Sequence, residues 1–415
     1  MELIVIVPGV KDKETYLKNI YAINKVLLNK KILNGEKIKV GFFVIYDSSF
    51  PAKPLFEKML GDEMFEPFIV IIPDTLRGAD NLLEQSDKTF DALSKQYRNV
   101  YNSYDKNKKI MIDFNENFDI ICTANPYDAM TYKYYQMENL SGTHVLPIYI
   151  PYGYFTLTYG RKLLQIPLMN YFWKIFVDSD LNYQEYKKYQ KIKGANAVVT
   201  GYCKMDELAK HKKNPSDRKR IILAPHHTVS EWKDGLELSN FLTYSDFFLE
   251  LPKLYPDIDF IFRPHQLLFV NLKKPELWGE EKTKKYLLEI LSNPNVLYSD
   301  GGDYMELFVN SDGIIHDCGS FVAEYLFTEN PSCYILRDEE AIEELFLPMG
   351  QKCLENYYKA YQQQDIIDFI DNVIIKGNDP LKEQRVKFVN SELKINYPNV
   401  AQEILNYIKS ELMNI

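Results

Sequence analysis

The stretch that decides the fold is SDGIIHDCGSFVAEYLFTENPSCYIL, which runs from Ser311 to Leu336. Two short apolar runs, GII and CYIL, flank a small polar loop, HDCGS, and a segment with a helical pattern. A strand, a helix and a second strand in this order are typical of a parallel sheet covered by helices. Strands buried on both faces of such a sheet are unbroken apolar runs, as these two are.

The same rhythm extends over the second half of the chain. Helical patterns at 244–256 and 283–293 separate further apolar runs, so the region from 195 to 365 is predicted to be a doubly wound α/β domain. The predicted strands lie at 196–201, 220–227, 259–266, 296–300, 313–317 and 332–336.

The first half, residues 1–194, has a similar organisation. A helical pattern at 13–30 follows the apolar run at 3–9, and further strands are predicted at 39–47, 68–74 and 118–128. We therefore predict an α/β protein with two doubly wound, Rossmann-like domains and a cleft between them. The polar segment 213–219 is the strongest linker-like signal, and we expect the helical region 366–415 to brace the first domain.

Composition excludes some classes of function. The chain has 415 residues, of which 46% are hydrophobic and 26% are charged, and its net charge is −9. This charge argues against a protein that binds nucleic acid along its whole length. From Arg161 to Arg220 there are 14 basic and 6 acidic residues, a local net charge of +8. Such a stretch indicates either a solvated surface or contact with an anionic partner.

The cysteines and the N-terminus bear on location. The five cysteines have no CxxC spacing, which favours a reducing compartment. The N-terminal run resembles a strand more than a signal peptide, and no window has the 18 or so apolar residues of a spanning helix. We expect a cytoplasmic protein that can still touch the inner face of the cytoplasmic membrane.

Polar residues follow four of the predicted strands in the second half. Ligands of open α/β sheets bind beyond the carboxyl ends of the strands, so these residues are the candidates for a site. Four of the six histidines of the chain are among them. The segments are Pro225–Thr228, Arg263–His265, Gly301–Asp303 and His316–Ser320.

These residue types suit a diphosphate. Arg263 offers a charged fork to phosphate oxygens, and His226, His227 and His265 can donate hydrogen bonds. Gly319 and Ser320 precede a predicted helix, whose free N–H groups favour an anion. Glu324, one turn into that helix, could hold the hydroxyls of a ribose.

Other interpretations of the same residues remain open. Ser320 could be only a helix N-cap, and Glu324 an ordinary surface residue. The three histidines with Asp317 could bind a metal, although no HxxxH or HExxH spacing is present. A Cys–His hydrolase built on Cys318 and His316 lacks the context of a nucleophile elbow. We predict neither a metal nor a cofactor.

With these motifs, the region from about 195 to 336 resembles the CDP-glycerol glycerophosphotransferase family, which includes teichoic acid polymerases and primases of GT-B-type fold. The family motif Arg-x-His-Pro is similar to Arg263-Pro264-His265, with the Pro displaced to position 264. Its Asp-Tyr-Ser-Ser motif, with an Asp four positions on, is similar to Asp317–Ser320, in which Gly319 replaces the first Ser, and Glu324 takes the place of the second Asp. GYCKMDEL (201–208) looks like the turn that opens the family's donor domain.

The resemblance implies roles for several residues. His265, Asp317 and Ser320 would lie against the pyrophosphate of the donor, with His316 and Gly319 beside them. The region 195–365 would then be the donor-nucleotide domain and 1–194 the acceptor side.

The chain departs from the family in the first domain. The family carries Trp-His-Gly-Thr, and its His is thought to activate the acceptor hydroxyl. The matching residues here are Pro151–Tyr154, so that Tyr152 replaces the His. A Tyr with an ordinary pKa near 10 is a poor base at neutral pH. Tyr152 would then position the acceptor, with His226 or His227 taking the proton.

Asn125, Tyr127 and Tyr154 are the other candidates on the acceptor side, because turns and tyrosines at strand ends suit sugar binding. The apolar, aromatic segment 161–177 with its interspersed basic residues indicates either a buried helix or an interfacial segment on an anionic membrane.

The resulting hypothesis is a transferase that moves glycerol phosphate, or a related polyol phosphate, from a CDP-activated donor. The acceptor would be a hydroxyl of a surface-glycan precursor of capsule, lipopolysaccharide or teichoic acid type. A GT-B glycosyltransferase or epimerase that uses a nucleotide sugar is the alternative. A non-catalytic binding protein that has lost the base is a third possibility.

Overall fold

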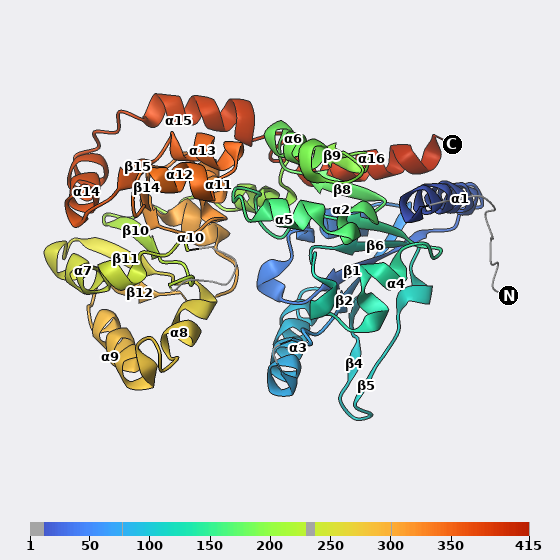
Figure 1. Cartoon of the computed structure of the whole chain (residues 1–415), viewed down its shortest axis with the longest axis horizontal. Helices are drawn as coiled ribbons and strands as arrows, with labels where there is room; N and C mark the ends of the chain where they lie inside the picture. Colours follow the sequence, from blue (N-terminus) through green and yellow to red (C-terminus); the bar gives the residue numbers. More distant parts are fainter. Residues whose placement is uncertain (1–11, 77, 230–236, 300, 415) are drawn as a thin grey trace. The chain divides into compact units, whose positions relative to one another are not determined.

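The computed structural model describes residues 12–76, 78–229, 237–299 and 301–414. These residues form two compact units (Figure 1), each with its own parallel sheet. Of the described residues, the first unit contains those within 12–153, 161–206 and 395–414, and the second contains those within 154–160 and 207–394. The α/β class with two Rossmann-like sheets is confirmed, whereas the strand predicted at 3–9 lies outside the described residues.

The first unit is built on a seven-stranded sheet in the order β3-β2-β1-β6-β7-β8-β9, with every neighbouring pair parallel. Its central strands are mostly buried: β1 is IKVGFFV, in which only Lys39 is exposed, and β6 is IICT, which is buried throughout. The strands are β1 (Ile38–Val44), β2 (Phe65–Ile71), β3 (Val100–Asn102), β6 (Ile120–Thr123), β7 (Leu146–Tyr149), β8 (Lys174–Val177) and β9 (Ala197–Val199).

Helices cover this sheet, and the last helix of the chain is one of them. In Figure 1, α16 (Val400–Met413) lies beside α1 (Lys13–Leu33), and the apolar residues of both enter the core of the first unit. A short hairpin, β4 (Tyr104–Asp105) with β5 (Ile110–Met111), stands apart from the sheet. The other helices are α2 (Lys53–Leu60), α3 (Ala79–Ser94), α4 (Met137–Leu140), α5 (Gly160–Gln165) and α6 (Asp180–Tyr189).

The second unit has a six-stranded parallel sheet in the order β12-β11-β10-β13-β14-β15. Its strands are β10 (Lys219–Ala224), β11 (Ile258–Phe262), β12 (Val296–Tyr298), β13 (Gly313–His316), β14 (Ser332–Ile335) and β15 (Tyr358–Ala360). Its helices are α7 (Phe241–Leu254), α8 (Gln266–Leu272), α9 (Gly279–Leu291), α10 (Met305–Asn310), α11 (Phe321–Glu324), α12 (Glu340–Leu345), α13 (Pro348–Leu354), α14 (Gln363–Asp368) and α15 (Lys382–Phe388).

Two sequence predictions in the boundary region were wrong. The strand at 196–201 was assigned to the second sheet, but β9 pairs with β8 in the first sheet. The segment 161–177 is not one helix: it forms α5, a 3₁₀ turn at Pro167–Asn170 and the sheet strand β8. Its large side chains, Phe172, Trp173 and Phe176 among them, are buried.

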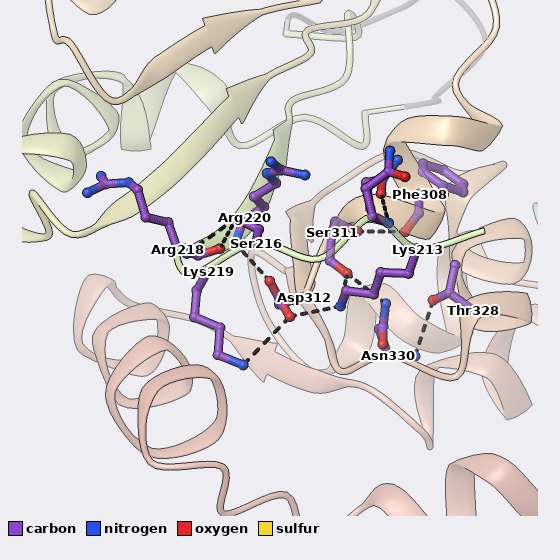
Figure 2. A network of polar contacts seen from close by, with 12 residues as sticks. Lys213, Ser216, Arg218, Lys219, Arg220, Phe308, Ser311, Asp312, Thr328 and Asn330 are labelled. Carbon is purple, nitrogen blue, oxygen red and sulfur yellow. Dashed lines mark hydrogen bonds and ion pairs between the residues drawn. The ribbon is translucent and has the colours of Figure 1, made fainter. Parts of the chain in front are cut away.

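The linker-like segment 213–219 is bound to the second unit (Figure 2). The Lys213 ammonium donates to the Ser311 carbonyl at 3.1 Å and to the Asp312 carboxylate at 2.9 Å. The other Asp312 oxygen accepts from the Arg220 backbone N–H at 2.9 Å. This network ties the segment to the start of β13 and fixes how the chain enters β10. Among the described residues, no helix is long and apolar enough to cross a membrane.

Candidate functional site

The candidate site lies where three neighbouring strands of the second sheet end. The register pairs Leu223 of β10 with Phe262 of β11, and Ala224 with His316 of β13. These three strands therefore finish at the same edge, the usual position of a ligand in an open α/β sheet. The predicted residues 226, 227, 265 and 317 all follow directly from these strand ends.

Two backbone hydrogen bonds extend the β10–β11 ladder into the loops. The Arg263 N–H donates to the Leu223 carbonyl at 2.8 Å, and the His265 N–H donates to the Pro225 carbonyl at 3.0 Å. These contacts hold the loop after β11 against the loop after β10. The histidines on the two loops are thereby brought together.

The structure packs His226, His227 and His265 against one another. The ring centroids are 4.3 Å apart for His226 and His227, 4.2 Å for His227 and His265, and 5.1 Å for His226 and His265. Burial, and then the neighbouring histidines, lower the pKa of His226 well below its usual value, so this ring is neutral at physiological pH. Its Nδ1 lies 3.0 Å from the hydroxyl of Thr228.

One hydrogen bond sets the tautomer of His265. Its Nδ1 accepts the Leu267 backbone N–H at 3.1 Å, so in the neutral ring the proton resides on Nε2. His227 is not fixed in this way: Asn271 donates to the His227 carbonyl at 3.0 Å, and its amide nitrogen is 3.5 Å from Nδ1, a distance too long to set the tautomer. An Nε2–H group is a donor for an anion, whereas a metal would need that nitrogen without its proton.

The three rings are also close enough to be considered as a metal site. One nitrogen from each lies within 4.8 Å of the others. The hydrogen bond from Leu267 argues against it, because His265 would have to break that bond or lose a second proton to bind a metal through Nε2. The donor set therefore fits an anion better than a cation.

Asp317 is buried beneath this cluster. Its Oδ1 accepts the His226 backbone N–H at 2.6 Å, and its Oδ2 accepts the Asn240 N–H at 2.7 Å. Burial raises the pKa of Asp317 to about 6, although these hydrogen bonds oppose the shift. The carboxylate thus joins the loop after β10 to the start of α7, which makes Asp317 a positioning residue for His226.

Arg263 is committed to the loop that follows β12. Its guanidinium donates to the Ser299 hydroxyl at 2.5 Å and to the carbonyls of Gly301 and Gly302 at 3.0 and 2.9 Å. It also lies 5.1 Å from the centre of the Tyr304 ring. With only 8% of its surface exposed, Arg263 orders this loop, and the predicted fork for phosphate is largely occupied.

Glu324 is completely buried and contacts Tyr304, whose ring also lies against the guanidinium of Arg263. The Tyr304 hydroxyl donates to Oε2 of Glu324, while Oε1 has no hydrogen-bond partner among the described residues. A buried carboxylate oxygen without a donor is costly, so it is a candidate to accept a ligand hydroxyl. Such a ligand would reach Glu324 only if the covering side chains moved.

The ring of His316 is engaged in the interior of the second unit. Its Nδ1 accepts the Cys318 N–H at 3.2 Å, its Nε2 lies 3.3 Å from the Tyr357 hydroxyl, and Tyr334 packs on the ring. Burial lowers its pKa to about 3. Because both nitrogens are engaged in the interior, this placement argues against the predicted contact with the donor.

The helix expected after Ser320 is only one turn long. α11 ends at Glu324 and continues as a 3₁₀ turn, and the Ser320 side chain makes no capping bond. A single turn carries little of the dipole on which the anion prediction depended. Gly319 packs on Leu157, and an added Cβ would come within 2.5 Å of that side chain.

The acceptor-side candidates follow β6 and β7 of the first unit, which are neighbours paired at Thr123 and Tyr149. The Asn125 side chain bonds both the N–H and the carbonyl of Tyr127, at 3.1 and 2.9 Å, and so shapes its own turn. Burial, followed by the nearby Tyr152, raises the pKa of Tyr127. Tyr152 is 46% exposed, whereas Tyr154 is buried and belongs to the second unit.

Sequence reasoning missed the residues that support the cluster. Asn240, Asn271 and Tyr304 each lie many positions from the group they contact. Only Tyr304 had a local signal, since it directly follows the segment Gly301–Asp303, which lies at a predicted strand end.

Comparison with known proteins shows the fold. No protein-family model and no curated protein matches the sequence. Among solved structures, a wall teichoic acid polymerase TagF variant soaked with CDPG is 14% identical, with a TM-score of 0.60 and coverage of 98% of this chain and 99% of that one. The UDP-GlcNAc 2-epimerase from Neisseria meningitidis bound to UDP-GlcNAc is 16% identical, with a TM-score of 0.56 and coverage of 90% and 100%.

The S. aureus MnaA–UDP structure is similar to the same degree, at 14% identity, a TM-score of 0.56 and coverage of 91% of this chain and 98% of that one. These likenesses extend over nearly the whole length of the chain. The chain therefore has a GT-B-type fold with two Rossmann-like units.

Proposed function

We propose that this chain is a GT-B-type transferase that takes glycerol phosphate, or a related polyol phosphate, from a CDP-activated donor. It would pass this group to a hydroxyl of a surface-glycan precursor. The observation that carries the proposal is the histidine cluster at the ends of β10 and β11, in which His265 is held with its proton on Nε2. Such a group can donate to a donor diphosphate without a metal ion.

The reaction is a phosphoryl transfer. The acceptor oxygen attacks the phosphorus of the glycerol phosphate, the bond from that phosphorus to the oxygen of CMP breaks, and CMP leaves as an anion. His265 stabilises the charge that develops on the leaving phosphate. His227 is assigned the hydroxyl proton, because the lowered pKa of His226 makes it a weak base and Tyr152 is a phenol.

The supporting residues have definite tasks in this scheme. Asp317 holds the His226 loop by its two backbone hydrogen bonds. Glu324 supplies a buried oxygen for a ribose hydroxyl. Arg263 holds Ser299, Gly301 and Gly302 by hydrogen bonds and adds positive charge to the region without contacting the phosphates.

The similar fold of UDP-GlcNAc 2-epimerases supports a second candidate, an enzyme that acts on a nucleotide sugar. The two candidates differ in the base that the site selects and in the group attached to the diphosphate. Resemblance of motifs favours the CDP donor, since the segments around His265 and Asp317 are those shared with the glycerophosphotransferases.

Calorimetric titration of the purified chain with CMP, CDP, UDP, GDP and CDP-glycerol tests the proposal. We expect cytidine-selective binding that is strongest for CDP-glycerol, and CMP release once an acceptor is added. His265→Ala should abolish the part of the binding affinity that comes from the diphosphate. His144→Ala, at an exposed histidine of the first unit, is the matched control. Uridine selectivity would move the chain to the nucleotide-sugar enzymes, and no binding of any nucleotide would refute both candidates.

A further inference from the structure

Helix α1 is apolar on two opposite faces. One face, with Leu17, Ile20 and Leu28, packs in the core of the first unit. The other face is in contact with solvent: the exposed fractions are 39% for Ile23, 51% for Val26, 54% for Leu27 and 79% for Leu33. Lys30 lies between Val26 and Leu33 on this outer face, so the exposed apolar side chains are interleaved with a basic one, and such a cluster is a candidate binding surface.

The charge around this stripe is positive. Helix α1 carries five lysines and only one acidic residue, Glu14, which is paired with Lys191 at 2.7 Å. Lys18 and Lys30 are exposed on the same face as the stripe, and neither has an ion-pair partner among the described residues. Lysine stems can lie along an apolar surface while their ammonium groups reach outward to phosphate.

A cavity opens beside the same face. Its volume is about 640 Å³, and it is bounded by α1, β8 and the end of α16. Lys18, Ala22 and Val26 belong both to its lining and to the exposed face, while Phe172 and Trp173 form an apolar wall. Lys25 belongs to the lining and is paired with Glu411 at 3.0 Å, and Glu14 also lines the cavity. The cavity could thus accommodate an apolar chain, while Lys18 in its lining could contact an anionic group.

We propose that the outer face of α1, with the adjoining cavity, binds the surface of a bilayer that contains anionic phospholipid. Ile23, Val26, Leu27 and Leu33 would enter the boundary between headgroups and acyl chains, and Lys18 and Lys30 would contact lipid phosphates. The purpose of this surface rests on the proposed function, since a lipid-linked glycan acceptor is met at a membrane. Its existence does not depend on that function.

Charge favours a lipid surface over a second copy of the chain. A two-fold contact through this stripe would bring the lysines of both copies near one another, and a stable dimer needs about 800 Å² from each partner. The net charge of the whole chain is −9, so an anionic membrane repels most of the molecule. Binding to such a membrane must therefore come from a local basic and apolar patch.

The test is co-sedimentation of the full chain with vesicles of phosphatidylcholine alone and with about 30 mol % phosphatidylglycerol. The variants are Val26→Glu with Leu27→Glu, and Lys18→Glu with Lys30→Glu. Leu288→Glu is the matched control, because Leu288 is 62% exposed on α9 of the second unit. Thermal unfolding of each variant checks that the fold is intact.

We expect the wild type and Leu288→Glu to bind only the anionic vesicles, less strongly at high salt. Either double variant should bind at least about tenfold more weakly. The proposal would be overturned if the wild type did not bind the anionic vesicles, or if the variants bound them as strongly as the wild type. It would also be overturned if the wild type were a dimer in sedimentation and Val26→Glu dissociated that dimer. Calorimetry with CDP-glycerol on the same samples separates the two proposals: intact vesicle binding without nucleotide binding would refute the proposed function alone.

Discussion

The two units end their strands with different chemistry. Beyond β10 and β11 of the second unit, three imidazoles lie with ring centroids 4.2 to 5.1 Å apart, above a buried carboxylate. Beyond β6 and β7 of the first unit, Asn125, Tyr127 and Tyr152 offer an amide and phenols, and the carboxylate of Asp128 is occupied by the N–H groups of Met137 and Glu138. The two sheets share a fold but not an electrostatic character.

This contrast suggests a division of labour. Imidazole N–H groups held in place by hydrogen bonds suit a diphosphate, whose charge increases as it leaves. Phenols and amides suit the hydroxyls of a neutral acceptor, which needs orientation more than charge. The chemistry should therefore depend strongly on the second unit and weakly on the tyrosines of the first. The following experiments test that asymmetry.

The largest effect is expected from His265→Ala. Removing the Nε2–H donor should lower kcat by about 10² to 10³-fold, as when one donor to a developing anion is lost. The same change should weaken the binding of CDP more than that of cytidine. Steady-state CMP release and calorimetry measure the two effects, with His144→Ala as control. A loss below threefold would mean that the cluster does not touch the leaving phosphate.

Asp317→Asn should change the pH dependence of stability. Burial raises the folded-state pKa of Asp317 to about 6, above an ordinary value near 4. The contribution of Asp317 to the free energy of unfolding is therefore full below about pH 4 and is lost as the pH rises through about 6. Two pKa units correspond to about 3 kcal/mol. The free energy of unfolding of the wild type minus that of Asp317→Asn should therefore fall by about that amount from pH 4 to pH 7.

Denaturant titrations at several pH values would show this trend. Asp217→Asn, at an exposed carboxylate of the second unit, provides a control whose difference from wild type should stay flat. A difference that rises with pH would mean that the hydrogen bonds from His226 and Asn240 outweigh burial and hold the carboxylate ionised.

Glu324→Gln should have an intermediate effect. It replaces one of the two carboxylate oxygens by an amide and removes the charge, while the side chain keeps its size. If Oε1 accepts a ribose hydroxyl, binding of CDP should weaken about tenfold, the equivalent of one hydrogen bond to a charged group. Tyr304→Phe, which deletes only the donor to Oε2, should leave binding closer to wild type. Equal loss in both variants would indicate a purely structural pair.

Much of the fold could be predicted from local patterns. The strands β10, β11, β13 and β14 are short apolar runs ended by polar residues, and their common edge follows from parallel pairing. The boundary could not be predicted in the same way. Whether β9 joins the first or the second sheet depends on its pairing with β8, and the sequence of three residues, Ala197–Val199, does not encode that choice.

The candidate site shows a similar limit. His226, His227 and His265 could be grouped from the sequence, because strand ends bring distant loops together. His316 could not be separated from them: β13 is buried on both faces, so alternation gives no sign of which way a side chain points. The partners of Asp317 and Glu324 lie 77 and 20 positions away, at Asn240 and Tyr304, and such contacts appear only in three dimensions.

The smallest effect is expected from Tyr152→Phe. Tyr152 is 46% exposed at the end of β7, and a phenol that only orients the acceptor contributes about one weak hydrogen bond. The variant should raise KM for the acceptor by less than about threefold and leave kcat and its pH profile unchanged. Tyr101→Phe, at a comparably exposed Tyr of β3, controls for the change itself. If Tyr152→Phe instead removed the basic limb of the pH profile, the phenol would be the group that takes the proton. The first unit would then share the acid–base chemistry, and the contrast between the two strand-end regions would be one of binding partners alone.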